Sequence, residues 1–445
     1  MQAGSSRIDI TPPKGIPMGG YLARTGSAEE VHDPLFVRAL VLDDGQQRAA
    51  IVSADLALID QALADEARRR IEQAVGIPAA HTMITVSHTH SGPLVMNRRI
   101  SNPDPLYAEG LRQNLVAVAE AAASRLRPVR IGAGRAKVYL GVNRRERTAD
   151  NRIVIGKNPS GYASPYARVL VVAEQDGGPL AILFTYGAHP VVLGPENLQI
   201  SGDYAGYAER VIEEDSGETA VALFALGFAG NVNVKYEKRD FAEVETFGSA
   251  LARAVIEAEK GIPLLADLPL QVRSLRVPLP QEPPPSMDEA QRMLFAERER
   301  LSSVLGRGEE KAEINQRRIM VEWASQLVEL AAQGGAAPPL ELEVQGMAIG
   351  NTVLVGLSGE VFAEYEKILA ELSPFEHTFP ISNANGTVGY LPTAAAFDEG
   401  GYEVETAPRL FGALRLRPEV EPVIRQAFAD LLGELAAAPE PAASS

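Results

Sequence analysis

Two stretches decide the fold: Arg48-Ala-Ala-Ile-Val-Ser-Ala-Asp55 and Thr82-Met-Ile-Thr-Val-Ser87. Both are short and apolar, and both contain β-branched residues, which is typical of buried strands. Between them, residues 60–75 have the spacing of apolar residues expected for an amphipathic helix. Strand, helix and strand form a βαβ unit. The sequence therefore predicts an α/β fold with a mixed or parallel sheet and flanking helices.

The alternation of strand-like and helix-like segments continues along the chain. Residues 105–126 carry apolar side chains on one helical face. Further strands are predicted at 180–186, 219–226, 347–357 and 378–382, and further helices near Asp203, Asp240 and Val361. We expect residues 1–280 and 339–435 to form a single large α/β catalytic domain.

Residues 281–338 differ from the rest of the chain. The segment opens with Gln281-Glu-Pro-Pro-Pro285, and a Gly-Gly-Ala-Ala-Pro-Pro stretch closes it at residues 334–339. Between them lies charged, helix-favouring sequence, which predicts a helical hairpin that carries the chain's single tryptophan, Trp323. Such an insertion can be a lid, an oligomer contact or a surface decoration. The tail, residues 436–445, is predicted to be disordered.

Composition excludes several classes of function. The net charge of −16 argues against a nucleic-acid partner, which needs a basic face. The chain has no cysteine, so a metal would need His, carboxylate, Tyr or water as ligands. No apolar run is long enough for a transmembrane helix, and the N-terminus does not resemble a secretory signal. From this we expect a cytoplasmic protein.

Only six residues of the chain are histidines, and His88 and His90 follow the predicted strand 82–87 directly. In extended backbone, residues i and i+2 point to the same side, so both imidazoles are expected to face one cavity. Ligands of open α/β sheets usually bind at the carboxyl ends of strands. The alternative is that the two side chains only cap the end of the strand.

Three further residues occupy comparable positions after predicted strands. His189 follows 180–186, Glu360 follows the strand that ends at Leu357, and Tyr390 comes after 378–382. Each has an ordinary alternative role. A lone histidine can be a satisfied loop residue, a carboxylate can be the N-cap or first-turn residue of the next helix, and a tyrosine can be a core or edge aromatic.

Short motifs spread over residues 7 to about 412 make the chain resemble the neutral/alkaline, non-lysosomal ceramidase family in its catalytic domain. The most specific is His88-Thr-His90-Ser-Gly-Pro93. The others keep the family order: Met18-Gly-Gly-Tyr21, His32-Asp-Pro-Leu35, Gly141-Val-Asn143-Arg144, Ala188-His189-Pro190, Ser201-Gly-Asp203-Tyr-Ala-Gly206, Gly230-Asn231-Val-Asn233, Gly359-Glu360, Gly389-Tyr390 and Gly401-Tyr402-Glu403.

The resemblance implies an amide hydrolase with one catalytic Zn²⁺ per chain, which activates a water for attack on the amide. The implied metal ligands are His88, His189, Glu360 and Tyr390. His90 is implied to face the reacting carbonyl, and Arg144 and Tyr402 to stabilise the oxyanion. The implied substrate is a small-molecule amide or an N-acyl lipid.

The sequence departs from the family pattern at two points. Asn233 stands where ceramide-cleaving members carry a serine, so a serine role is not transferred to this position. Asn231 and Asn233 instead fit a loop-structuring role, or bonds to substrate. The family's C-terminal immunoglobulin-like domain has no counterpart in this sequence. The missing domain, together with the lack of a recognisable signal peptide, makes a smaller, soluble amide an alternative to ceramide as the expected substrate.

Two other functions compete with the zinc hydrolase. A serine hydrolase would use Ser91 or Ser201, but neither lies in the Gly-x-Ser-x-Gly elbow that such a nucleophile normally needs. A degenerate family member would bind metal or lipid without turnover. The predicted ligands and oxyanion residues are all retained, which argues against that function.

Overall fold

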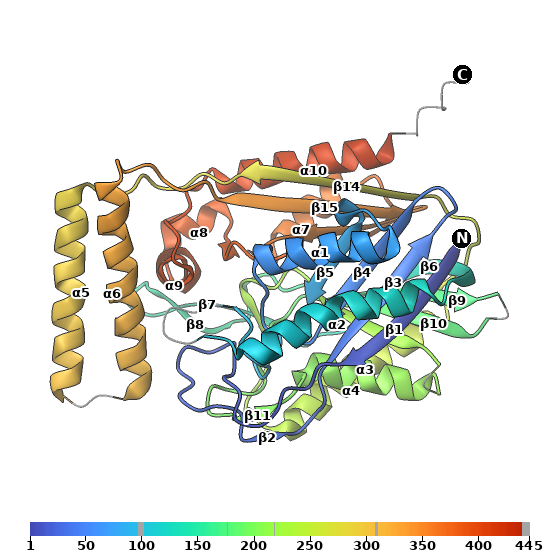
Figure 1. The fold of residues 1–445 in the computed structure, drawn as a ribbon, viewed down its shortest axis with the longest axis horizontal. Coiled ribbons are helices and arrows are strands. Elements are labelled where there is room, and N and C mark those ends of the chain that lie inside the picture. The colour runs from blue at the N-terminus through green and yellow to red at the C-terminus, as the bar shows by residue number, and fades with distance from the viewer. Residues whose placement is uncertain (97–101, 176, 218, 308–309, 438–445) are drawn as a thin grey trace.

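The computed structural model of the chain describes residues 1–96, 102–175, 177–217, 219–307 and 310–437. It is a mixed α/β structure, which confirms the predicted fold class (Figure 1). The largest sheet has eight strands. In spatial order they are β12 (Val221–Leu226), β10 (Pro179–Tyr186), β9 (Tyr166–Glu174), β6 (Arg127–Lys137), β1 (Gln2–Asp9), β3 (Phe36–Asp43), β4 (Arg48–Ala54) and β5 (Thr82–Val86).

The predicted βαβ unit is present in this sheet. β4 and β5 pair in parallel, and α1 (Gln61–Val75) connects them. The carboxylate of Asp60 caps the helix by accepting from the Leu63 N–H, as expected for an N-terminal Asp. β10 and β12 are also parallel, whereas the remaining neighbours are antiparallel, so the sheet is mixed.

A second sheet packs against one face of the first. Its strands are β14 (Leu270–Pro278), β15 (Glu341–Ile349), β16 (Thr352–Leu357) and β18 (His377–Ile381). The predicted single strand 347–357 is wrong, because the chain reverses within it. Gly350 adopts a φ of 58°, which glycine tolerates, and the resulting turn makes β15 and β16 an antiparallel hairpin. Apolar side chains from both sheets form the core between them, including Leu183, Leu223, Leu354 and Phe379.

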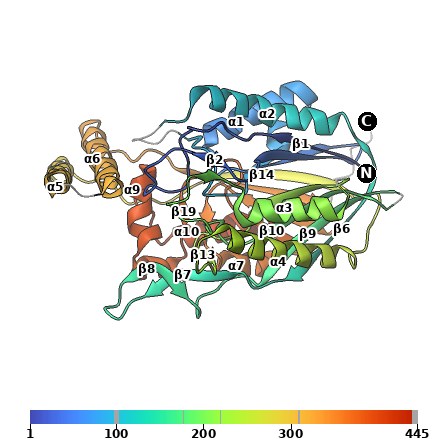
Figure 2. The same cartoon turned by 90° about the horizontal axis from the view of Figure 1, so that it is seen from below.

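Helices cover the outer faces of both sheets, which gives a helix–sheet–sheet–helix arrangement. Four helices pack on the eight-stranded sheet: α1, α2 (Pro105–Ala123), α3 (Asp203–Asp215) and α4 (Phe241–Glu259). In the view from below, α1 and α2 lie together at the top of the picture, apart from α3 and α4 (Figure 2). Two others pack on the second sheet: α7 (Tyr365–Leu372) and α10 (Val420–Ala436). In the described parts of the chain, no helix is long and apolar enough to span a membrane.

Residues 281–338 contain two packed helices, α5 (Met287–Arg307) and α6 (Lys311–Ala332), which stand at one end of the molecule (Figure 1). Trp323 on α6 packs with Ala290, Leu327 and Leu414, so it anchors the hairpin to the main body. The predicted disordered tail falls mostly on residues 438–445, which lie outside the described residues. Ala436 is the last residue of α10.

Short strands and turns between the layers carry most of the candidate site. They are β2 (Glu30–Val31), β7 (Gly141–Arg147), β8 (Ile153–Asn158), β11 (Gln199–Ile200), β13 (Val232–Val234), β17 (Glu360–Val361) and β19 (Tyr390–Leu391). The short helices are η1 (Ala79–His81), α8 (Ala394–Glu399), the π-helix η2 (Tyr402–Thr406) and α9 (Ala407–Phe411).

Candidate metal centre

The first part of the site is a turn that follows β5. The prediction that this segment is extended is wrong, because His88 has a φ of 66°, in the left-handed region. The backbone N–H groups of Ser87 and His88 donate to Ala54 and Leu56, which holds the turn in place. The turn still brings His88 and His90 to one site, with ring centroids 4.8 Å apart. A strained backbone of this kind is characteristic of functional sites.

Glu360 and Tyr390 meet through a pair of short parallel strands. Glu360 opens β17, Tyr390 opens β19, and the two residues lie opposite each other in the register. Glu360 is therefore not an N-cap or first-turn residue, because helix α7 begins only at Tyr365. The helix predicted to start near Val361 is present as α7, but it begins at Tyr365, after β17. Two predicted ligands that are 30 positions apart in sequence are thus neighbours across one β-bridge.

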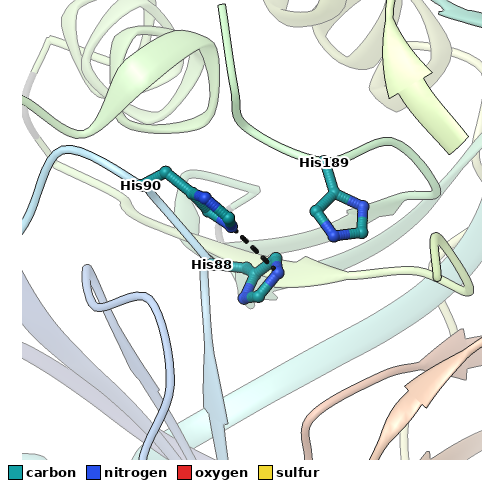
Figure 3. Close-up of side chains that lie close together, drawn as sticks. All are labelled: His88, His90 and His189. Carbon is teal, nitrogen blue, oxygen red and sulfur yellow. Dashed lines mark hydrogen bonds between the residues drawn. The ribbon is translucent and has the colours of Figure 1, made fainter. Parts of the chain in front are cut away.

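His88, His189 and Glu360 converge on one buried point. His189 Nε2 lies 3.1 Å from Glu360 Oε2, and His88 Nε2 lies 3.5 Å from the same oxygen. His90 approaches from the other side, with its Nε2 3.3 Å from His88 Nε2 (Figure 3). One ring nitrogen from each of the three histidines lies within 4.8 Å of those of the other two. His88, His189 and Glu360 are at most 3% exposed.

Backbone carbonyls fix which ring nitrogen of two histidines faces the site. His88 Nδ1 bonds the Ala57 carbonyl, and His189 Nδ1 bonds the carbonyls of Ala229 (2.8 Å) and Val232 (3.1 Å). A carbonyl only accepts, so each Nδ1 carries the proton, and each neutral ring turns an Nε2 lone pair into the site. Two lone pairs and a carboxylate then face one another, an arrangement that a cation stabilises.

The spacing of these atoms fits a metal ion. Four ligands at zinc–nitrogen and zinc–oxygen distances lie about 3.3 Å from each other in a tetrahedron. The distances of 3.1 and 3.5 Å from Glu360 Oε2 to the two histidines match that value. The distance of 3.3 Å between His88 and His90 matches it as well. The contacts of His88 and His189 with Glu360 therefore fit a metal ion, and the three histidines, whose ligand nitrogens lie within 4.8 Å of one another, form a second candidate set.

The hydrogen bonding of the Nδ1 atoms distinguishes the two sets. Histidines that bind metals almost always donate their other ring N–H to a carbonyl, carboxylate or water. His88 and His189 do so, whereas His90 Nδ1 is buried and has no hydrogen-bond partner among the described residues. The environment of His90 is thus that of a group left available to another molecule.

The electrostatics of the cluster favour neutral imidazoles. Burial, assisted by the Arg144 charge, lowers the pKa of His189 to about 4. Burial and the neighbouring histidines hold the pKa of His90 well below its ordinary value. Burial opposes ionisation of Glu360, but the neighbouring His189 and His88 outweigh burial and hold the pKa of Glu360 well below the usual range. Neutral imidazoles and an ionised carboxylate are the forms that bind metals.

The segment that contains Gly20 and Tyr21 holds the His90 ring in place. The Tyr21 ring meets the His90 ring edge-on at 4.9 Å, and its hydroxyl donates to the Leu193 carbonyl. Gly20 has a φ of 89°, and a Cβ there would lie 2.7 Å from atoms of His90. Only glycine fits this position, which explains the Met-Gly-Gly-Tyr motif in structural terms.

Arg144 borders the cluster on the side of Tyr390. Its Nη1 lies 3.3 Å from His189 Nε2, and its guanidinium lies 5.3 Å from the centre of the Tyr390 ring. Its Nη2 is buried and has no hydrogen-bond partner among the described residues. A buried guanidinium donor beside the cluster suits an oxygen that develops negative charge.

Glu403 is a functional residue to which the sequence reasoning assigned no role. Its two carboxylate oxygens accept from Arg144 Nε and Arg145 Nη1, both at 2.8 Å. Burial opposes ionisation, but the two arginines hold the pKa of Glu403 below its ordinary value. Glu403 follows Tyr402 in the π-helix η2, and Tyr402 lies 5.8 Å from Tyr390 between ring centroids. The Gly-Gly pair before Tyr402 was the available sequence signal.

The two asparagines near residue 232 have different roles. Asn231 structures the loop: its Oδ1 accepts from the Ala363 N–H, and its Nδ2 donates to Glu364 at 2.8 Å. Asn233 faces the site, with its Oδ1 3.3 Å from Arg144 Nη1. The residue that replaces the family serine thus contacts the predicted oxyanion-stabilising arginine.

The geometry disfavours a serine hydrolase. The Ser91 hydroxyl accepts from Asn197 Nδ2 at 3.1 Å, and the Ser201 hydroxyl donates to Asp33 at 2.6 Å. Neither hydroxyl bonds to a histidine in the described part of the chain. Both serines are completely buried. A nucleophilic serine is normally activated by a histidine, and neither serine hydroxyl bonds to one among the described residues.

Asn385 joins the β5 side of the site to the second sheet. Its Oδ1 accepts from the Ile84 N–H, and its Nδ2 donates to Glu343 (3.0 Å) and Gln345 (2.8 Å). We expect Asn385→Gly to lower the free energy of unfolding by about 2–4 kcal/mol, because buried partners are left without bonds. Urea denaturation measures the change.

Asn385→Ala provides the matched comparison. The φ of Asn385 is 59°, so alanine adds about 1–2 kcal/mol of backbone strain that glycine avoids. The alanine variant should therefore be the less stable of the two. A glycine variant as stable as the wild type would show that these three bonds contribute no stability.

The sequence model for "Neutral/alkaline non-lysosomal ceramidase, N-terminal" matches residues 1–234. The neutral ceramidase of Drosophila melanogaster is 26% identical over 238 residues, which cover 48% of this chain and 32% of that protein. The chain therefore matches about a third of the length of this curated relative.

Solved structures resemble the whole fold. The crystal structure of neutral ceramidase from Pseudomonas aeruginosa matches with a TM-score of 0.73 and 20% identity, over 99% of this chain and 76% of that one. A ceramidase complexed with C2 matches with a TM-score of 0.72 and 19% identity, over 100% and 78%. These likenesses support the fold. Because the family model covers more than half of the sequence, the chain belongs to the neutral/alkaline non-lysosomal ceramidase family.

Proposed function

We propose that this protein is a zinc-dependent hydrolase that cleaves the amide bond of an N-acyl amine. One observation carries the proposal: carbonyl bonds to both Nδ1 atoms turn the Nε2 atoms of His88 and His189 toward the Glu360 carboxylate, at mutual distances that fit zinc. Membership of the ceramidase family supports an amide as the bond that is cleaved.

The residues that would hold the ion are His88, His189, Glu360 and Tyr390. Tyr390 is included because it pairs with Glu360 across β17 and β19 and lies beside Arg144. His90 is left out because its Nδ1 has no hydrogen-bond partner among the described residues, whereas Nδ1 of the other two histidines bonds a backbone carbonyl. Zinc rather than another divalent ion suits a set of nitrogen and oxygen ligands without cysteine.

When bound, zinc would lower the pKa of a water molecule to about 7 and polarise the amide carbonyl. Side chains of the protein would stabilise the developing charge and transfer the proton. Arg144 Nη2 and the Tyr402 hydroxyl would donate to the carbonyl oxygen as negative charge develops on it. His90, a neutral imidazole with an unsatisfied Nδ1, would contact the reacting amide and move a proton there. Glu403 holds Arg144 in position.

The substrate is proposed to be an N-acyl amine, either a lipid or a smaller soluble amide. An activity screen with N-acyl amines of graded acyl length, with and without a chelator, tests this. We expect hydrolysis of at least one series, complete loss with chelator and recovery with added zinc. Hydrolysis that resists chelation and is blocked by a phosphonate probe would instead indicate a serine hydrolase. Bound metal with no turnover would indicate a binding protein.

The α5–α6 hairpin contacts the segment that carries Tyr402. Ile319 and Met320 on α6 pack with Leu410, and Leu22 and Tyr402 pack against the same cluster. We expect Ile319→Ala to lower kcat about tenfold while zinc content is unchanged, because a small displacement of Tyr402 weakens its contact with the substrate. Steady-state kinetics and metal analysis measure both quantities.

The matched control for this variant is Leu327→Ala. Leu327 lies on the same helix but packs in a different cluster, with Trp323. Leu327→Ala should destabilise the hairpin about as much as Ile319→Ala does, and it should leave kcat close to that of the wild type. Equal losses of kcat in the two variants would mean that the contact with Tyr402 has no specific role.

A further inference from the structure

A cavity of about 530 Å³ lies where the α5–α6 hairpin meets the main body. Its walls are the proline segment 283–285, helices α5 and α6, and the η2–α9 region. Its apolar surface comes from Met293, Trp323, Leu327 and Leu414 together with the prolines. None of the metal-centre residues lines it in the part of the chain that the structure describes. The volume is within the range of small-molecule sites.

Three of the charged groups around the cavity have partners within the protein. Glu282 forms an ion pair with Arg415 at 3.0 Å. Glu289 accepts from both the backbone N–H and the hydroxyl of Ser286, as a capping box at the start of α5. These contacts leave Glu282, Arg415 and Glu289 unavailable to a ligand.

Two arginines at the rim remain available. Arg292 on α5 and Arg409 on α9 are exposed, and neither has an ion-pair partner among the described residues. Arg409 also lies over the Trp323 ring, 5.1 Å from its centre. Glu405, also at the rim, is exposed and has no ion-pair partner among the described residues either. Two guanidinium groups and one carboxylate thus remain unpaired around the cavity, which leaves a single positive charge on a chain whose net charge is −16.

We propose that this cavity binds an alkyl carboxylate, with the carboxylate at Arg292 and Arg409 and the alkyl chain along Trp323 and Leu327. A guanidinium matches a carboxylate with two parallel hydrogen bonds, which favours this headgroup over a neutral one. The buried Trp323 ring, the prolines and the aliphatic side chains that line the cavity form an apolar surface that suits a flexible hydrocarbon chain.

The location of the cavity relates this ligand to the metal centre. Glu405 belongs to η2, the π-helix that begins at Tyr402, and Arg409 belongs to the next helix, α9. A carboxylic acid is one product of the proposed amide hydrolysis. We identify the ligand with this product only on the basis of the proposed function. The choice of a carboxylate headgroup depends only on the charges around the cavity.

Trp323 is the only tryptophan of the chain, so its fluorescence reports directly on this cavity. We expect 12-bromododecanoate, titrated below its micelle concentration, to quench Trp323 fluorescence saturably, because bromine quenches only at close contact. The ammonium analogue with the same chain, 12-bromododecyl-trimethylammonium, should quench weakly. Arg292→Gln combined with Arg409→Gln should weaken carboxylate binding at least about tenfold, through loss of charge-assisted bonds.

Arg298→Gln serves as the matched control, because Arg298 is exposed on the same helix but does not line the cavity. It should bind like the wild type. Equal quenching by both headgroups, or unchanged binding in the double variant, would overturn the proposal. So would loss of quenching in His88→Ala, which would place the ligand at the metal centre. Light scattering that shows a dimer with Trp323 shielded from the carboxylate would make a second copy the occupant and also overturn it.

Binding is measured without turnover, so this inference and the proposed function can fail separately. Saturable quenching in a protein that hydrolyses no amide would support the cavity and contradict the hydrolase. Zinc-dependent hydrolysis without quenching would support the hydrolase and contradict the cavity.

Discussion

Replacing His88 with alanine is expected to remove bound zinc and to reduce amide hydrolysis about a thousandfold or more. The metal contributes several kcal/mol of transition-state stabilisation, and each 1.4 kcal/mol is about a factor of ten in rate. His88 provides an Nε2 lone pair that its Ala57 bond aims at Glu360. Its loss removes one of the proposed ligands and leaves a buried carboxylate facing His189 alone. Metal analysis and initial rates on the best amide from the screen measure both effects.

His377→Ala is the matched control for this variant. His377 opens β18, and its Nε2 lies 3.6 Å from Glu376 Oε1. Among the described residues, it contacts none of the residues of the metal centre. It should keep wild-type zinc and activity. A His88→Ala protein that retains zinc and full activity would show that the cluster is not the catalytic metal site.

Replacing Arg144 with alanine is expected to lower kcat by about a hundred- to a thousandfold, the usual effect of removing one oxyanion donor. Zinc should be retained, because the carbonyl bonds that orient His88 and His189 do not involve Arg144. Arg144→Lys should recover little activity, since lysine lacks the planar fork that bonds Glu403 and presents a second nitrogen to the site.

Unfolding experiments separate this effect from simple loss of stability. Arg144 and Glu403 are both buried, so truncating one of them costs several kcal/mol. Arg145→Ala removes the other partner of Glu403 without touching His189, and it should lose stability with a smaller loss of kcat. Equal kcat losses in the two variants would assign Arg144 a structural role only.

The sequence predicts the fold class and the strand ends well because both depend on local patterns. The runs 48–55 and 82–87 bury β-branched side chains on both faces, and that pattern alone defines the βαβ unit. The strand 347–357 was predicted wrongly because its apolar run spans a tight turn. The Gly350-Asn351 pair is a two-residue hairpin signal, and hydrophobic periodicity, on which the prediction rested, does not detect it.

The site was predictable in its members but not in its geometry. His88 and His189 follow apolar runs, so their positions at strand ends could be read directly. The β17–β19 bridge that places Tyr390 beside Glu360 is two residues long per strand and has no sequence signal of its own. The link from Glu403 to Arg144 and Arg145 spans more than 250 positions, and only the tertiary fold creates it.

In the proposed site, His88, His189 and Glu360 hold the metal, and His90 does not. Zinc titration of metal-free wild type and metal-free His90→Ala tests it most directly. Both proteins should bind one zinc per chain with similar affinity, because His90 lacks the carbonyl bond that orients the other two imidazoles. If His90→Ala fails to bind zinc while Glu360→Gln binds it normally, the three histidines hold the metal and Glu360 does not.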